Sequence, residues 1–289
     1  MKRALESLEG LACGDAFGER FFLPPDVAVP MISQRATPAP PWFFTDDTMM
    51  AISIVSTLEK HAEINSDFLA RDFAHRYDSS RGYGPAMHKL LAEIRHGGDW
   101  KIEAQALFGG QGSFGNGSAM RVAPLGAYFA DDLDSIPEQA ARSAVTTHCH
   151  GEAVAGATAV ALAAGLAFLG KASRGKHDPQ DFLEKLHAKT PESKVREGVR
   201  KAIELPKGTT VEKAVFALGN GTLVSCQDTL PFTLWCAANY LHSYEEALWA
   251  TGRGLGDRDT TCAIVGGIVV MYTGVGAIPK EWLESRETL

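Results

Sequence analysis

The chain has 289 residues, and its 28 Lys and Arg against 35 Asp and Glu give a formal net charge of −7. This acidic balance disfavours a nucleic-acid-binding protein, whose phosphate contacts need a positive face. With 45% hydrophobic and 22% charged residues, the composition excludes a disordered chain and is typical of a globular one.

Apolar residues recur at helical spacing along most of the chain, for example in 48–61 and 237–251. Segments that alternate apolar and polar residues over the length of a strand are scarce, and no alternation of strands with helices emerges. We therefore predict an all-α fold, a compact multi-helix bundle in a single domain over residues 1–289.

Several segments stand out against this helical pattern. Residues 153–170 and 262–279 approach the length of a membrane span, but Ala, Gly and Thr dilute both of them. We predict that they form helices packed inside the protein, with no membrane contact. The polar stretch 171–213 predicts solvated peripheral helices. The proline-rich segment 23–41 and the glycine-rich segment 109–118 predict loops.

Cysteine usage and the N-terminal segment bear on the compartment. The five cysteines form no CxxC pair, and their odd number leaves at least one unpaired in any disulfide scheme. The first residues, MKRALESLEGLACGDAF, carry acids where an export signal would be apolar. Both observations favour a reduced, cytoplasmic protein.

Two acidic turns are candidates for a metal site. Residues 45–48 (TDDT) begin one amphipathic helix, and residues 256–261 (GDRDTT) begin an apolar one. Helix capping alone explains a threonine and acids in a first turn, and this alternative stays open. If the two turns met in the fold, four carboxylates would share a small volume and need a counter-charge. All-oxygen ligands favour Mg²⁺, with Mn²⁺ possible, over Zn²⁺.

The segment 109–118 (GGQGSFGNGS) is a candidate anion site. Its glycines let backbone N–H groups converge on an anion, and the helix predicted to follow adds positive potential. Gly110, Gly112 and Gly115 satisfy GxGxxG, but no buried strand precedes them, no βαβ unit follows, and no Walker lysine closes the loop. The alternative is an ordinary flexible loop.

Six motifs together resemble one known family. They are GDAFG at 14–18, TDDT at 45–48, RGYG at 81–84, GSFGNGSAMR at 112–121, TH at 147–148 and GDRDT at 256–260. In this order, from about residue 8 to about residue 284, they are similar to the ADP-ribosylglycohydrolase family, which includes dinitrogenase-reductase-activating glycohydrolase and the ADP-ribosylhydrolases. The resemblance is closest to the branch that hydrolyses ADP-ribosylserine.

The resemblance implies a metal-dependent hydrolase that cleaves the glycosidic bond between ADP-ribose and a modified side chain, serine or arginine, or a small acceptor. It implies two Mg²⁺ ions, or Mn²⁺, held by Thr45, Asp46, Asp47, Asp257, Asp259 and Thr260. It implies a diphosphate site at Gly112, Ser113, Gly115, Asn116 and Gly117, aromatic contacts to the adenosine from Phe108 and Phe114, and a ligand contact from His148. Glu19, Asp46 or Asp47 would act as the catalytic base.

Two departures from the family pattern concern residues close to these motifs. The family often has a glutamate four residues after the GDAFG motif, but Phe22 stands there, and Glu19 follows the motif directly. The residue between the two downstream aspartates is often small, whereas here it is Arg258. We expect Arg258 to pair with a nearby acid in preference to a substrate phosphate.

Two alternatives to this function remain open. One is a non-catalytic ADP-ribose-binding or structural family member, and the other is a di-metal phosphohydrolase that acts on the diphosphate. The residue or molecule that carries the ADP-ribose is also open; a nucleic acid is expected only as a modified substrate. A monomer is favoured.

Overall fold

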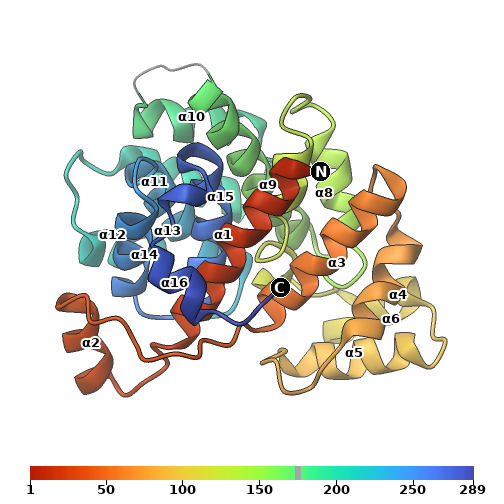
Figure 1. Ribbon diagram of the computed structural model, residues 1–289. Helices are drawn as coiled ribbons and strands as arrows, with labels where there is room; N and C mark the ends of the chain where they lie inside the picture. The colour runs from red at the N-terminus through yellow and green to blue at the C-terminus, as the bar shows by residue number, and fades with distance from the viewer. Residues whose placement is uncertain (173–176) are drawn as a thin grey trace.

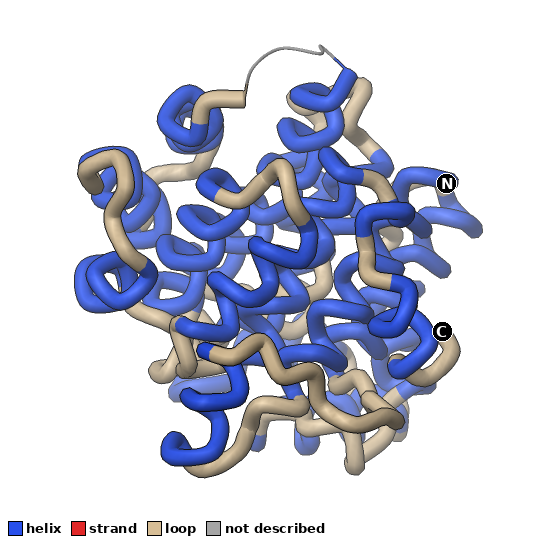
Figure 2. Tube along the Cα trace, turned by 60° about the vertical axis from the view of Figure 1, so that its left-hand side comes forward, coloured by secondary structure: helices blue, strands red, loops and turns tan. Residues whose placement is uncertain are grey.

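The computed structural model describes residues 1–172 and 177–289, and helices dominate them. Over these residues Figure 2 shows helices and connecting loops with no strand. The only sheet-like pairing in the same range is two isolated β-bridges, Trp42 with Arg286 and Gly115 with Ser225. The predicted all-α class is therefore confirmed.

The helices run in chain order as follows. They are α1 (Lys2–Glu19), α2 (Pro25–Ser33), α3 (Asp46–His61), α4 (Ser66–Arg76), α5 (Pro85–Arg95), α6 (Trp100–Gly110), η1 (Asn116–Ser118), α7 (Ala123–Tyr128), α8 (Ile136–Ala144), α9 (Gly151–Ala172), α10 (Pro179–Lys189), α11 (Lys194–Glu204), α12 (Val211–Leu218), α13 (Cys226–Asn239), α14 (Tyr244–Arg253), α15 (Arg258–Thr273), η2 (Val275–Ala277) and α16 (Lys280–Ser285).

Helices α1 and α15 pack against each other at the centre of the protein (Figure 1). Gly10, Gly14 and Gly18 recur every four residues and therefore share one face of α1. A Cβ atom at Gly14 would lie 2.2 Å from the carbonyl oxygen of Cys262, and one at Gly18 would lie 2.1 Å from that of Arg258. Only glycine permits this close approach. It places the end of α1 against the first turn of α15.

The other helices surround this pair. In Figure 1, α3 to α6 lie to one side of it, and α10 to α14 lie to the other. The buried apolar residues form one continuous cluster that extends from Ala4 to Trp282. All five cysteines are free.

The first long apolar segment is the core helix α9, as predicted, whereas the second is a core helix only as far as Thr273, where α15 ends; η2 follows and has no buried residue. Among the described residues, α9 is the one helix long and apolar enough to cross a membrane, over Gly151–Lys171, and 72% of an apolar 18-residue window in this span is buried inside the protein. It packs against α15, α7 and α8. In α15, every residue from Thr260 to Met271 is buried.

The predicted peripheral and loop segments have mixed outcomes. The polar stretch forms α10 and α11, as predicted, although 173–176 lie outside the described residues. The prediction of a loop throughout 23–41 is wrong, because it contains α2. Pro25 occupies the first helical position, where its fixed φ is favourable, and Ala28 and Ile32 bury one side of the helix.

Candidate active site

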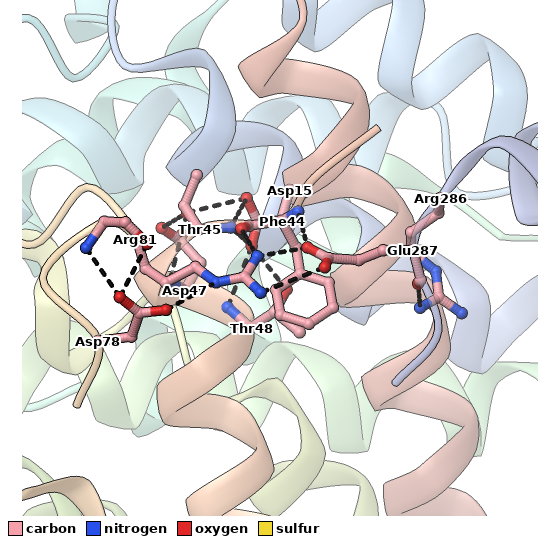
Figure 3. A network of polar contacts seen from close by, with 10 residues as sticks. Asp15, Phe44, Thr45, Asp47, Thr48, Asp78, Arg81, Arg286 and Glu287 are labelled. Atoms are coloured by element: carbon pink, nitrogen blue, oxygen red, sulfur yellow. Dashed lines mark hydrogen bonds and ion pairs between the residues drawn. The ribbon is translucent and has the colours of Figure 1, made fainter. Parts of the chain in front are cut away.

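Asp15 holds the first acidic turn in place. It is fully buried in α1, and its carboxylate accepts hydrogen bonds from the backbone N–H and hydroxyl of both Thr45 and Thr48, at 2.6 to 3.1 Å (Figure 3). Thr45 is also the N-cap of α3, since its hydroxyl accepts from the N–H of Asp47. In the sequence alone Asp15 has no distinguishing signal of its own, although it lies in the GDAFG motif, one of the six that resemble the family.

The two acidic turns meet in the fold, which is the condition under which their carboxylates could share a site. Asp257 is the N-cap of α15 and Asp259 lies in its first turn. The hydroxyl of Thr260 donates to Oδ2 of Asp47 at 3.4 Å, across 213 positions of sequence. This contact follows from the glycine face of α1, which brings Asp15 and the first turn of α15 to the same end of the central helix pair.

The carboxylates in this region strongly affect one another. Burial raises the pKa of Asp46 to about 8, and the charge of Asp15 adds to the shift. Burial also raises the pKa of Asp47 and Asp259 well above the usual range; the nearby charge of Asp15 adds to the effect on Asp47, and that of Asp257 to the effect on Asp259. Carboxylates that are buried close together cannot all stay ionised without a counter-charge.

The donor set fits a hard divalent cation in its chemistry. It offers carboxylate and hydroxyl oxygens, which Mg²⁺ and Mn²⁺ prefer. Oδ1 of Asp47 is buried and has no hydrogen-bond partner in the structure as described. Within the described residues, however, no three His, Cys, Asp or Glu side chains are arranged closely enough to hold a metal ion. The carboxylates share one region but do not converge on a single point.

The glycine-rich loop contacts the second acidic turn directly. Nδ2 of Asn116 donates to Oδ2 of Asp257 at 2.7 Å and to the hydroxyl of Thr229 at 3.1 Å. Several backbone amides of the loop already donate within the protein: Gly112 to Leu107, Gly115 to the Ser113 hydroxyl, and Asn116 to Val224. These amides shape the loop, so an anion would have to be bound by the others and by the Ser113 hydroxyl, whose hydrogen is free to donate.

Phe108 and Phe114 form an exposed aromatic pair on this loop. Their side chains are 59% and 40% exposed, and their ring centroids lie 6.4 Å apart with an interplanar angle of 30°. Phe108 has a positive φ of 51°, which breaks the end of α6 and turns the chain into the glycine-rich segment. Exposed ring faces of this kind are suited to stacking with a planar base.

His148 is buried beneath the loop. Its Nδ1 shares a hydrogen bond of 2.7 Å with the Thr147 hydroxyl. A Cβ atom at Gly117 would lie 2.7 Å from its Cε1 atom, so the loop backbone rests on the imidazole ring. Burial, with a smaller effect from the cation of Arg121, lowers the pKa of His148 to about 3. The ring is therefore neutral and supports the loop from below.

Glu19, at the end of α1, lies beside the carboxylates of the two acidic turns. It lines a cavity of about 610 Å³ together with Thr45, Asp259 and Phe22. Burial and the charge of Asp15 raise its pKa. A second cavity of about 940 Å³ lies near α4 and α6 and is lined by none of the predicted site residues.

The expectation that Arg258 pairs with an acid is wrong. Its guanidinium donates to the carbonyl oxygen of Phe21 at 2.5 Å and lies over the ring of Phe22, 4.6 Å from the ring centre. Within the described residues it forms no ion pair. The reason is that α1 is followed by a turn that presents the carbonyl oxygen of Phe21, which also accepts the N–H of Leu23 at 2.7 Å, within hydrogen-bond distance of Arg258. Arg258 thus fixes the segment after α1.

Residues 1–288 match the family described as ADP-ribosylglycohydrolase. The chain belongs to this family. The resemblance inferred from the six motifs is therefore confirmed. As an ADP-ribosylglycohydrolase, the protein is a glycohydrolase enzyme, and the bond concerned is a glycosidic bond of ADP-ribose.

Individual relatives agree with this assignment. The chain is 27% identical to ADP-ribosylhydrolase ARH3 of Danio rerio over 99% of this chain and 87% of the relative. It is 28% identical to the human ADP-ribosylhydrolase ARH3 over 85% and 75% of the two chains. A solved structure described as an ADP-ribosylglycohydrolase-related protein complex superposes with a TM-score of 0.65 at 25% identity, covering 99% of this chain and 92% of the other.

Proposed function

We propose that this ADP-ribosylglycohydrolase is a divalent-cation-dependent enzyme that releases ADP-ribose from a modified side chain or a small acceptor. One observation carries the proposal. Two helix N-termini, 213 positions apart at their contact, share a buried region that contains the unpaired Oδ1 of Asp47. A cation would satisfy that oxygen and would remove the repulsion among the neighbouring carboxylates.

The residues that would hold two Mg²⁺ ions, or Mn²⁺, come from both turns. They are Thr45, Asp46, Asp47, Asp257, Asp259 and Thr260. Because these side chains do not yet converge, binding requires small rotations of the carboxylates about their side-chain torsions. When bound, the ions would supply positive charge that orients the ribose hydroxyls and acidifies a water molecule.

The reaction moves one proton and exchanges one bond. Water adds to the anomeric carbon of the ribose, the bond to the acceptor breaks, and the acceptor leaves with a proton. Glu19, Asp46 or Asp47 would take the proton from the water. Burial raises the pKa of Glu19 toward neutral pH, and general acid–base catalysis works best when the pKa of the catalytic group lies near the working pH.

The glycine-rich loop would hold the diphosphate, and Phe108 and Phe114 would stack against the adenine. The bond between Asn116 and Asp257 links this loop to the carboxylates. Remote binding of this kind positions the sugar for reaction. His148 would support the loop from beneath, because the backbone at Gly117 rests on its ring.

Release of ADP-ribose from peptides tests the proposal. Peptides with ADP-ribosylated serine or arginine are incubated with the enzyme in Mg²⁺ or in a chelator, and the products are identified by mass. We expect Mg²⁺-dependent release of intact ADP-ribose, which is lost in Asp259→Asn and kept in Asp132→Asn, a change at an exposed carboxyl. The serine and arginine arms show which acceptor is cleaved.

Other products would support the alternatives. Binding without release indicates a reader, and AMP with ribose phosphate indicates cleavage of the diphosphate. Release that is equally fast in a chelator contradicts the metal dependence while leaving the glycohydrolase assignment intact. The cytoplasmic location and the monomeric state stay predictions.

A further inference from the structure

Residues 285–287 lie beside the segment that leads into the first acidic turn. The backbone N–H of Trp42 donates to the carbonyl of Ser285 at 2.7 Å, and that of Glu287 donates to the carbonyl of Trp42 at 2.9 Å. Arg286 donates to Glu9 of α1 at 2.8 Å. Figure 3 shows Glu287 directed at the start of α3. Residues far apart in sequence therefore meet at the candidate metal-binding turn.

The carboxylate of Glu287 contacts two groups at this turn. Its Oε1 accepts the backbone N–H of Phe44 at 2.9 Å, and both of its oxygens accept from the guanidinium of Arg81. Arg81 in turn donates to the carbonyl of Phe44 at 2.9 Å and accepts the N–H of Asp46 at its own carbonyl at 2.7 Å. Glu287 and Arg81 together thus hold the backbone of Phe44 and Asp46, the residues on either side of Thr45.

These contacts complete a continuous set of backbone bonds. The N–H groups of Phe44, Thr45, Asp46, Asp47 and Thr48 each have an acceptor inside the protein. Asp15 and Thr45 supply the acceptors for three of them from within the site motifs. Arg81 and Glu287 supply the other two, and Glu287 is the acceptor furthest away in sequence.

We propose that Glu287 is a positioning residue that, through Phe44 and Arg81, fixes the turn 45–47 for cation binding. The inference rests on the proposed function, because it concerns how the proposed metal ligands are held. Within the described part of the chain, the side chain of Glu287 bonds to Phe44 and Arg81 and to none of the four aspartates of the two acidic turns. Groups that orient metal ligands from behind change metal affinity about 10- to 100-fold when they are removed.

Magnesium binding measured without turnover tests this role. Wild type, Glu287→Ala, Glu287→Gln and the control Glu284→Ala are titrated with Mg²⁺, and the shift in melting temperature and the calorimetric affinity are recorded. Glu284 belongs to α16 nearby, but its side chain is 64% exposed and its partner, Lys280, is 86% exposed. We expect about tenfold weaker Mg²⁺ binding in Glu287→Ala, from the lower end of that range, and unchanged binding in the control.

The two Glu287 variants separate the contacts. Glutamine keeps an oxygen that can accept from Phe44 but loses the charge opposite Arg81, so we expect an effect between those of alanine and wild type. A merely structural role would lower the melting temperature of Glu287→Ala equally with and without Mg²⁺, and that result would overturn the inference. If Mg²⁺ fails to bind wild type, the proposed metal dependence itself fails, and the inference with it.

Discussion

Replacing Asp46 by asparagine should have opposite effects on stability with and without Mg²⁺. In the folded protein, burial and the charge of Asp15 raise the pKa of Asp46 to about 8 from its ordinary value of 3.8. At pH 7 the side chain must therefore take up a proton on folding, which costs about 4 kcal/mol at 1.36 kcal/mol per pKa unit. Asparagine removes this cost while keeping the shape of the side chain.

The expected gain is smaller than that limit, because the neighbouring carboxyls titrate together and share the relief. With half of the limit, about 2 kcal/mol, and an unfolding entropy of about 0.6 kcal/mol per degree for 289 residues, Asp46→Asn should melt about 3 °C above wild type in a chelator. Because the folded-state pKa is raised, the cost grows as pH increases from about 4 to 8. The advantage of asparagine should therefore shrink at pH 5.

Magnesium should reverse the order. At a concentration 100 times its dissociation constant, a cation that binds only the folded protein stabilises it by about 2.7 kcal/mol, or between about 4 and 5 °C here. Wild type should gain this shift and Asp46→Asn should lose most of it. Melting followed by circular dichroism, with Asp132→Asn as control, measures both conditions. If Asp46→Asn melts below wild type in chelator, or shows the full Mg²⁺ shift, the reasoning is wrong.

Three further changes test the loop, the histidine and the central helix pair. Gly117→Ala places a Cβ atom 2.7 Å from His148, so ADP-ribose affinity measured by calorimetry should fall about tenfold, which is about 1.4 kcal/mol. Gly151→Ala, with open space around the new Cβ atom, should leave the affinity unchanged. The pKa of His148, about 3 when folded and about 6.5 when unfolded, means that stability is lost as pH falls below 6.5. Between pH 7 and 5 wild type should lose about 2 kcal/mol more than His148→Gln in urea unfolding, and equal losses would contradict the buried neutral ring. Gly14→Ala directs a Cβ atom to 2.2 Å from the carbonyl oxygen of Cys262 and should lower the free energy of unfolding by about 3 kcal/mol; a loss below about 0.5 kcal/mol would show that the helices can separate freely.

The sequence by itself determined the features that depend on near neighbours in the chain. Helical spacing of apolar residues predicted the all-α class, and TDDT and GDRDTT predicted helix N-termini that the structure places at 46 and 258. The six motifs were sufficient to identify the family. Where local signals conflicted the prediction failed, as in 23–41, where prolines concealed the short helix α2.

Only the tertiary structure decided which of these features meet. The contact of Thr260 with Asp47, the buried role of Asp15, the carbonyl partner of Arg258 and the approach of Glu287 to Phe44 all join residues at least 30 positions apart. The physical reason is that such contacts depend on how closely whole helices approach, and here the glycine face of α1 sets that distance against α15. The four-residue spacing of the glycines in α1 is visible in the sequence, but the close approach that it permits appears only once the partner helix is known.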